Sequence, residues 1–230
     1  MKPSLSFIST IIRPLDHFLR IRNIIVTQVL SHFKREIRYT RKAGSDIIRL
    51  ITLELIVNEI RANNILGSVA ELGVYRGDFA QYINDYFPDR YFYLFDTFKG
   101  FDHRDTIFEL KKGLNPVDHD FSDTNIEIIL KKMKYEQKCI IKKGFFPESL
   151  NGLEDNFCFV SLDADLYQPT LKGLEYFFPR LNPGGFILVH DYNNDEFSGV
   201  RAAVRDYSKI NKIVRVPVAD AAGTLIIGKS

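Results

Sequence analysis

Two acids two residues apart follow one apolar run of the sequence, and a His-Asp pair follows a later one. The run Phe157–Leu162 is followed by Asp163 and Asp165, and the later run by His190 and Asp191. An ionised carboxylate is costly to bury without a partner, so acids at the ends of buried strands need a cation or a ligand. Carboxylate oxygens suit a hard divalent ion such as Mg²⁺. The pattern therefore indicates a metal site or, for Asp163 and Asp165, caps of the helix that follows.

A second set of candidate residues surrounds the glycine-containing stretch "AELGVYRGDFA". Glu71 precedes Gly73 and Gly77, and glycine permits backbone torsions and a close ligand approach that a Cβ would block. The stretch matches neither the GxGxxG fingerprint of dinucleotide binding nor a P-loop, which counts against NAD and ATP. Asp96 ends the next apolar run, and α/β sheets bind ribose hydroxyls through an acid at that place.

The elements that must position these residues alternate between strand and helix from residue 67 onward, which predicts a doubly wound α/β sheet. The expected strands are "SVAELGV", "YFYLFDTF", "CIIKKGFF", "FCFVSLDADLY" and "GFILVHDY", followed by the hairpin "KIVRVPVAD" and "GTLIIGKS". We predict a mostly parallel, seven-stranded, Rossmann-like sheet with an antiparallel terminal hairpin. Ligands bind such sheets at the carboxyl ends of the strands, so Asp163 and Asp191 should converge there.

The amino-terminal part of the chain differs from the rest. Residues 1–42 hold nine Lys or Arg against two acidic residues, although the whole chain carries a net charge of only +2. We expect a helical extension at residues 1–65 and the α/β domain at 66–230. The basic, apolar arm suits packing in a homodimer or weak contact with an anionic membrane surface. The stretch "DIIRLITLELIVNEIRANN" predicts a helix with Ser45 or Asp46 as its N-cap.

Composition narrows the class of protein further. The charge of +2 does not favour nucleic acid as a partner, and the chain lacks an apolar stretch of about 20 residues that could cross a bilayer. Cys139 and Cys158 show neither zinc nor disulfide spacing. We therefore expect a cytoplasmic protein.

Several of these stretches resemble the motifs of a known family. "AELGVYRGDFA", "YLFDTFKGF", "RLNPGG" and the terminal hairpin resemble class I S-adenosylmethionine-dependent methyltransferases. More narrowly, "LDADLYQPTLKGLEYFFPRLNPGGFILVHDY" followed by "GVRAAVRDY" is similar to the macrocin O-methyltransferase (TylF/MycF-type) family. These are metal-dependent sugar O-methyltransferases of antibiotic and polysaccharide pathways. The resemblance implies methyl transfer from S-adenosylmethionine to a hydroxyl of a small acceptor, most often a sugar.

The resemblance also implies a role for particular positions. Asp163, His190 and Asp191 would hold Mg²⁺ or another divalent cation, although His190 stands where the family often carries an acid. Either Asp163 or His190 would act as the catalytic base. Asp165 would either support the metal ligands from behind or orient a substrate hydroxyl. The cofactor would be bound by Glu71, Gly73, Tyr75, Gly77, Asp96, Thr97, Phe98, Gly144 and Phe145.

Three other functions stay open on the sequence. The acceptor could be a non-sugar diol such as a catechol. The "DAD" triplet could be the DxD motif of a glycosyltransferase, although that fold does not account for "ELGVYRG" or "NPGG". The chain could also be a non-catalytic partner subunit with a cofactor-binding fold. The polar stretch 101–123 is expected to fold over the site as a lid.

Overall fold

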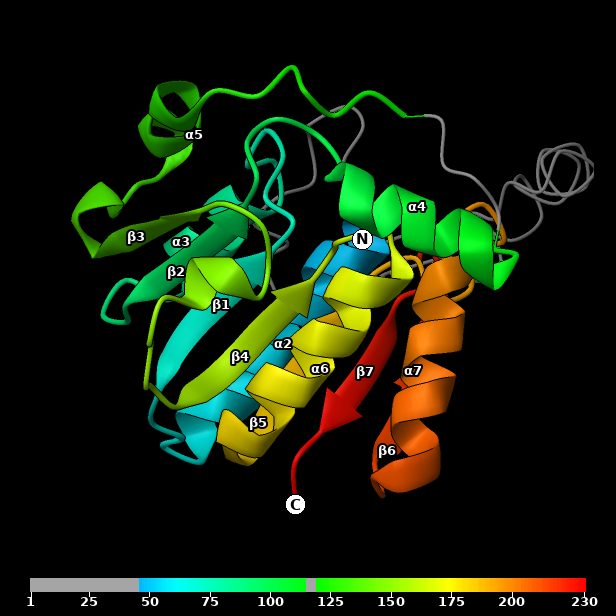
Figure 1. Ribbon diagram of the computed structural model, residues 1–230. Helices are drawn as coiled ribbons and strands as arrows, with labels where there is room; N and C mark the ends of the chain where they lie inside the picture. Colours follow the sequence, from blue (N-terminus) through cyan, green and yellow to red (C-terminus); the bar gives the residue numbers. More distant parts are fainter. Residues whose placement is uncertain (1–45, 115–118) are drawn as a thin grey trace, which may run out of the picture. The chain divides into compact units, whose positions relative to one another are not determined.

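A seven-stranded sheet forms the centre of the computed structural model, which describes residues 46–114 and 119–230 (Figure 1). The strand order is β3-β2-β1-β4-β5-β7-β6; β1 to β5 pair in parallel and β7 runs antiparallel to both β5 and β6. The predicted mixed sheet with a terminal hairpin is confirmed. The strands are β1 Ser68–Leu72, β2 Phe92–Asp96, β3 Cys139–Lys143, β4 Phe157–Leu162, β5 Leu181–Val189, β6 Val214–Pro217 and β7 Leu225–Gly228.

The central strands are buried because helices cover both faces of the sheet. Every residue of β1 and of β4 is buried, as expected for the middle of a parallel sheet. Leu72 pairs with Leu162, and Leu162 with Val189, so β1, β4 and β5 end at the same level. The residues that follow these strands, Gly73, Asp163 and His190, therefore meet at one edge of the sheet.

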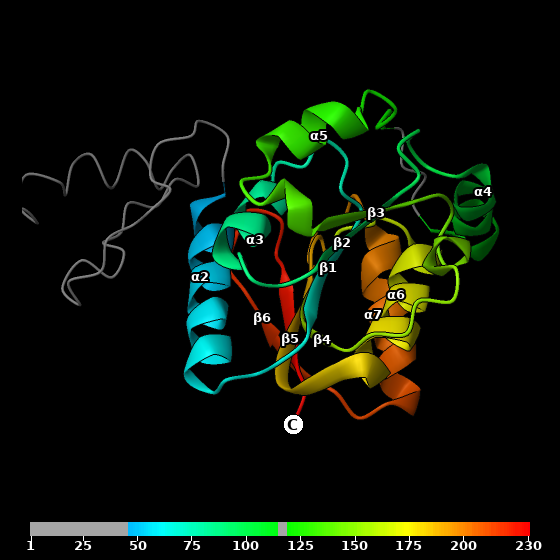
Figure 2. The same ribbon diagram turned by 90° about the vertical axis from the view of Figure 1, so that its left-hand side faces the viewer.

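The helices form two layers and a covering group. Figure 2 shows α2 and α3 on one face of the sheet and α6 and α7 on the other, with α4 and α5 towards the end where the parallel strands finish. The helices are α2 Ile47–Ala62, α3 Ala80–Tyr86, α4 His103–Lys112, α5 Ile126–Lys132, α6 Tyr167–Arg180 and α7 Ser198–Ile210, with short 3-10 turns at Glu136–Lys138 and Glu148–Leu150.

Helix α2 begins where its local sequence predicts. The Asp46 carboxylate caps it, accepting from the backbone N–H of Ile48 at 3.0 Å and of Arg49 at 3.1 Å. Leu53 and Val57 are fully buried, so the helix packs on the sheet. The described residues, 46–114 and 119–230, belong to one compact unit. Helix α2, which we expected in the amino-terminal extension, is part of this unit.

Two details differ from the local sequence pattern. Strand β5 begins at Leu181, before the Asn-Pro-Gly-Gly that resembles a turn, because Leu181 still pairs with Phe157 and a register shift absorbs the glycines. The residue before α6 is Leu166, whose side chain cannot accept a hydrogen bond from the first turn of the helix. The Tyr167 N–H instead donates to Glu109 of α4, so Asp163 and Asp165 are not the caps of this helix.

Residues 1–42, for which we predicted a role in dimer or membrane contact, lie outside the described residues. Residues 115–118 of the expected lid also lie outside them. Within 46–114 and 119–230, no helix is both long and apolar enough to cross a membrane.

Candidate active site

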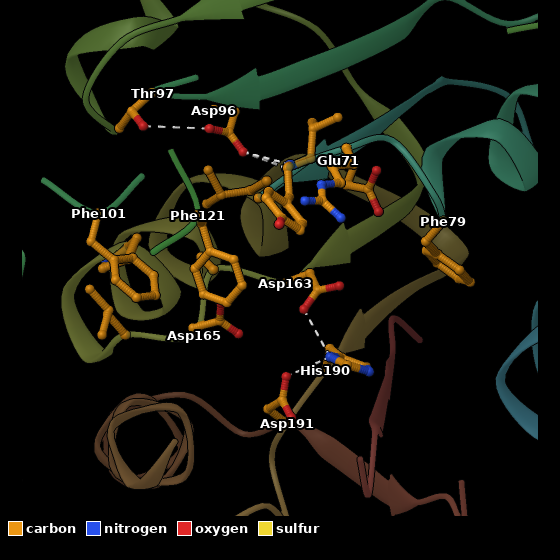
Figure 3. Close-up of a pocket in the computed structure, with 18 of the residues that line it drawn as sticks. Glu71, Phe79, Asp96, Thr97, Phe101, Phe121, Asp163, Asp165, His190 and Asp191 are labelled. Carbon is orange, nitrogen blue, oxygen red and sulfur yellow. Dashed lines mark hydrogen bonds and ion pairs between the residues drawn. The ribbon is translucent and has the colours of Figure 1, made fainter. Parts of the chain in front are cut away.

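A cavity of about 770 Å³ opens at the carboxyl ends of β1, β2, β4 and β5 (Figure 3). This volume suits a ligand the size of a cofactor with a small acceptor. Gly77 and Phe98, both predicted to bind cofactor, do not line it: Gly77 faces Ile129 of α5, and Phe98 is buried. The other predicted site residues line it: Glu71, Gly73, Tyr75, Asp96, Thr97, Gly144, Phe145, Asp163, Asp165, His190 and Asp191.

Gly73 lets the ends of β1 and β4 approach closely. Its φ is +88°, and a Cβ built on it would lie 1.9 Å from the backbone oxygen of Asp163. Glycine avoids both the steric clash and the strain of a left-handed conformation. The backbone of the predicted cofactor turn can therefore lie directly beside the first predicted metal ligand.

Asp96 organises the same turn through its carboxylate. Its Oδ2 accepts from the backbone N–H of Val74 and of Tyr75, both at 2.8 Å, and its Oδ1 accepts from that of Phe98 at 2.7 Å. Three backbone amides on two segments are thus tied to one side chain. Asp96 thus holds the cofactor turn in shape, in addition to the ribose contact predicted for it.

Aromatic side chains form another part of the cavity wall. Phe121 makes edge contacts with Tyr75 at 4.9 Å and Phe101 at 5.1 Å between ring centroids. The Arg104 guanidinium carbon lies 3.5 Å from the centroid of the Phe145 ring. Phe101 and Phe121 belong to the stretch expected to act as a lid, and both line the cavity.

Asp163, His190 and Asp191 point towards one another (Figure 3). The Nδ1 atom of His190 lies 2.9 Å from Asp163 Oδ1 and 2.6 Å from Asp191 Oδ2. One ligand atom from each residue lies within 4.8 Å of the other two. Nδ1 is buried, yet neither contact has hydrogen-bond geometry. The two carboxylate oxygens and Nδ1, all possible metal ligands, therefore face one common point. Nδ1 makes no hydrogen bond at that point.

Neighbouring side chains turn one oxygen of each acid into this cluster. Asp191 Oδ1 accepts from Asn194 Nδ2 at 2.8 Å, which leaves Oδ2 towards His190. Asp163 Oδ2 accepts from Arg49 Nη2 at 3.0 Å, which leaves Oδ1 towards His190. Partners behind a metal ligand commonly fix its orientation in this way.

Charges inside the cluster favour the ionised forms of Asp163 and His190. Burial favours the neutral acid at Asp163, but the charges of His190 and Arg49 outweigh it and hold the pKa of Asp163 below its usual value. Burial likewise lowers the pKa of His190, but Asp163 and Asp191 outweigh it and raise that pKa to about 10. Without a metal ion, His190 is therefore protonated at neutral pH.

Burial and nearby acids raise the pKa of two further acids in the cavity wall. The pKa of Asp165 lies well above its usual value, mainly because of burial and then because of the charges of Asp163 and Asp191. The pKa of Glu71 is also raised, mainly by burial and then by the charge of Asp163. Arg49 and Ser161 lower this pKa, but only in part. Both carboxyls are suited to a ligand that brings its own hydrogen-bond donor or positive charge.

Arg49 is the main site residue that sequence reasoning missed. It lies in the first turn of α2, lines the cavity and contacts Asp163. A signal was present, because Arg49 is followed at helical spacing by buried Leu53, Ile56 and Ile60. A lone basic residue in the apolar stripe of a helix indicates a buried acidic partner or a ligand.

The two histidines of the lid stretch are not part of the site. The His103 side chain is 81% exposed, and His119 lies 2.7 Å from Glu196. Neither lines the cavity. Among the described histidines, His190 is therefore the one candidate for chemistry there.

Asp105, in the first turn of α4, gives a testable pH effect. It is buried in the cavity wall, and burial, followed by Asp102, raises its pKa to about 7. Its unfolded pKa is near 3.9, so folding loses stability as the pH rises from about 4 to 7. Asp105→Asn should change the free energy of unfolding little at pH 4 and raise it by about 2–4 kcal/mol at pH 8. Urea denaturation at both values measures this.

The matched control for this change is Asp89→Asn, because the Asp89 side chain is 70% exposed. It should show no comparable difference between the two pH values. An Asp105→Asn effect of equal size at pH 4 and pH 8 would contradict the proposed cost of ionisation.

The sheet order and the position of the cavity define the class of protein. Solved structures with the same fold include the O-methyltransferase NovP, with a TM-score of 0.66 at 19% identity over 80% of each chain. A calicheamicin methyltransferase matches with a TM-score of 0.63 at 18% identity, over 99% of this chain and 94% of the other. The fold is that of the class I, Rossmann-like methyltransferases.

The chain belongs to the macrocin O-methyltransferase (TylF) family, whose model matches residues 42–224. It is 27% identical over 174 residues to the 8-demethyl-8-(2,3-dimethoxy-alpha-L-rhamnosyl)-tetracenomycin-C 4'-O-methyltransferase of Streptomyces olivaceus. It is also 27% identical over 173 residues to the mycinamicin III 3''-O-methyltransferase of Micromonospora griseorubida. Each match covers 69% of this chain, but only 64% of the first relative and 67% of the second.

Proposed function

We propose that this protein transfers a methyl group from S-adenosylmethionine to a hydroxyl of a sugar, in a natural-product or polysaccharide pathway, with the help of a divalent cation. The observation that carries this proposal is the convergence of Asp163, His190 and Asp191 in the cavity wall. Family membership and the names of the two curated relatives, both of which are O-methyltransferases, support the reaction class and the acceptor class.

The residues present fit a divalent cation. They supply two carboxylate oxygens and one imidazole nitrogen, and Arg49 and Asn194 orient the two acids from behind. This donor set suits Mg²⁺, and its imidazole also suits other divalent ions. A cation bound there would lower the pKa of an acceptor hydroxyl and orient it.

The protein's own groups divide the cavity into two regions. The Gly73 turn, Glu71 and Asp96 bind the methyl donor on the side of β1 and β2, and the acceptor lies on the side of β4 and β5. Asp165 orients a hydroxyl of the acceptor by a hydrogen bond. Alignment of the two reactants in a closed site supplies much of the rate of such a transfer.

His190 acts as a ligand in this proposal rather than as a ready base. Its Nδ1 faces both carboxylates, and the same contacts hold its proton tightly when no cation is present. Asp163 is a weak base for a similar reason, because Arg49 and His190 stabilise its charge. The remaining task of both residues is to hold the cation and, through it, the acceptor.

The fold and the family bear differently on the three alternative functions. The fold and the family match do not support a DxD glycosyltransferase. A catechol or another non-sugar diol remains a second acceptor class, since vicinal hydroxyls of either kind could reach the same cluster. Turnover separates an active enzyme from a non-catalytic partner subunit.

An acceptor screen tests the proposal. The protein is incubated with S-adenosylmethionine, Mg²⁺ and a panel of sugar glycosides and catechols, and the products are identified by mass spectrometry. We expect a product heavier by one methylene unit from a sugar with vicinal hydroxyls. Methylation of catechols alone would reject the sugar assignment, and tight binding of a nucleotide sugar without S-adenosylhomocysteine binding would reject the reaction class.

A further inference from the structure

Besides His190, two side chains in the cavity wall carry buried polar atoms that lack a hydrogen-bond partner among the described residues. Glu71 is 1% exposed with both carboxylate oxygens unpartnered, and Arg49 is 8% exposed with Nε unpartnered. Buried polar groups in folded proteins nearly always have a partner, because each unmet one costs free energy. Both residues line the same cavity, so a ligand in that cavity is a natural partner for both.

The rest of the Arg49 guanidinium is already fixed in place. Its Cζ atom lies 3.7 Å from the centroid of the Phe79 ring, and its Nη2 lies 3.0 Å from Asp163 Oδ2 and 3.5 Å from Ser161 Oγ. These contacts leave the Nε–H as an oriented donor for one more acceptor.

The two unpartnered groups are opposite in charge. Glu71, near the end of strand β1, offers acceptors, whereas Arg49 offers a donor that is always positive. Figure 3 shows Glu71, Phe79 and Asp163 around this part of the cavity. A ligand that satisfies both groups needs a cationic donor and an anionic acceptor close together. An α-amino acid carries both on one carbon atom.

We infer that Arg49 binds the α-carboxylate of the methionine part of the methyl donor, while Glu71 receives its α-ammonium group. The inference rests on S-adenosylmethionine being the donor, as proposed above, and adds a residue from the helix before β1. Arg49 then contacts the donor's tail and Asp163 together. Its role is donor recognition: it distinguishes the full donor from an adenosine derivative that lacks the carboxylate.

The experiment compares two ligands on the full chain by calorimetry. One is S-adenosylhomocysteine, and the other is its decarboxylated counterpart, S-adenosyl-3-thiopropylamine, which keeps the amine. The unsubstituted protein should bind the first at least about tenfold more tightly, as expected for a hydrogen bond between charged groups. In Arg49→Met this preference should fall to about twofold or less, with little change for the decarboxylated ligand.

Controls separate recognition from damage to the fold. Arg61→Met changes the same residue type on the same helix, where Arg61 donates to the Tyr86 carbonyl and does not line the cavity, and it should keep the full preference. Arg49→Lys, which keeps a positive charge beside Asp163, should retain part of the preference and serves if the methionine variant does not fold. Equal weakening of both ligands by either Arg49 variant would overturn the inference. Failure of the unsubstituted protein to bind S-adenosylhomocysteine would overturn the proposed donor itself.

Discussion

Replacing Asp163 with asparagine should lower turnover by more than about 100-fold, because even the partners behind a metal ligand are worth 10–100-fold. Asparagine keeps the size of the side chain and an oxygen that can accept from Arg49, but it removes the charge that attracts a cation. The affinity for S-adenosylhomocysteine should stay within a few-fold, since Glu71 and Asp96 lie on other strands and Gly73 directly follows β1. Steady-state kinetics and calorimetry on the same preparation measure the two effects.

Asp195→Asn is the matched control for the Asp163 variant. Asp195 lies in the loop after β5, its side chain is 90% exposed, and it pairs with Arg201 outside the cavity. It should leave turnover unchanged. EDTA should stop the unsubstituted enzyme, and Mg²⁺ should restore it. Full activity in EDTA together with an active Asp163→Asn variant would show that the acids do not hold a catalytic cation.

Replacing Gly73 with alanine should destabilise the protein by more than about 3 kcal/mol and abolish binding of the methyl donor, because strain at such a position is among the few large mutational effects. A Cβ there would lie 1.9 Å from the Asp163 backbone oxygen, and backbone atoms cannot yield as a flexible side chain can. Either β1 or β4 must shift, which separates the cofactor turn from the acid cluster. Thermal unfolding with and without S-adenosylhomocysteine measures both losses.

Gly152→Ala distinguishes that steric clash from backbone strain alone. Gly152 also has a positive φ, +71°, but a Cβ on it would meet nothing within 4 Å. It should cost about 1–2 kcal/mol, the usual penalty of a left-handed alanine, and leave donor binding intact. Equal losses from the two variants would mean that the close approach of β1 and β4 does not matter.

The comparison of sequence and structure is clearest for the strands. Buried parallel strands are nearly continuous apolar runs, so β1, β2 and β4 and their terminal acids could be recognised locally. The meeting of Asp163 with Asp191 followed from a general rule, because parallel strands end at one edge of the sheet. The Asp46 cap of α2 was also local, since the capped N–H groups lie within three residues of it.

Contacts between segments that are distant in the chain could not be predicted from the local sequence. The N-terminus of α6 is capped by Glu109 of α4, 58 residues away in the chain. The start of β5 at Leu181 depended on pairing with Phe157, which overrode the turn preference of Asn-Pro-Gly-Gly. In both cases a hydrogen-bonding partner from elsewhere in the fold outweighed the local preference.

The sequence by itself determined the sheet, the family and the acids and histidine at the strand ends, because hydrophobic periodicity and local motifs carry that information. Only the tertiary structure decided how the polar atoms pair. Arg49 contacts Asp163 across 114 residues of chain, and Asp96 holds the Val74–Tyr75 turn with oxygens that were expected to face only a ribose. Side-chain pairing depends on packing and burial in three dimensions, where an unmet charge is costly, and no periodic pattern records which partner will meet it.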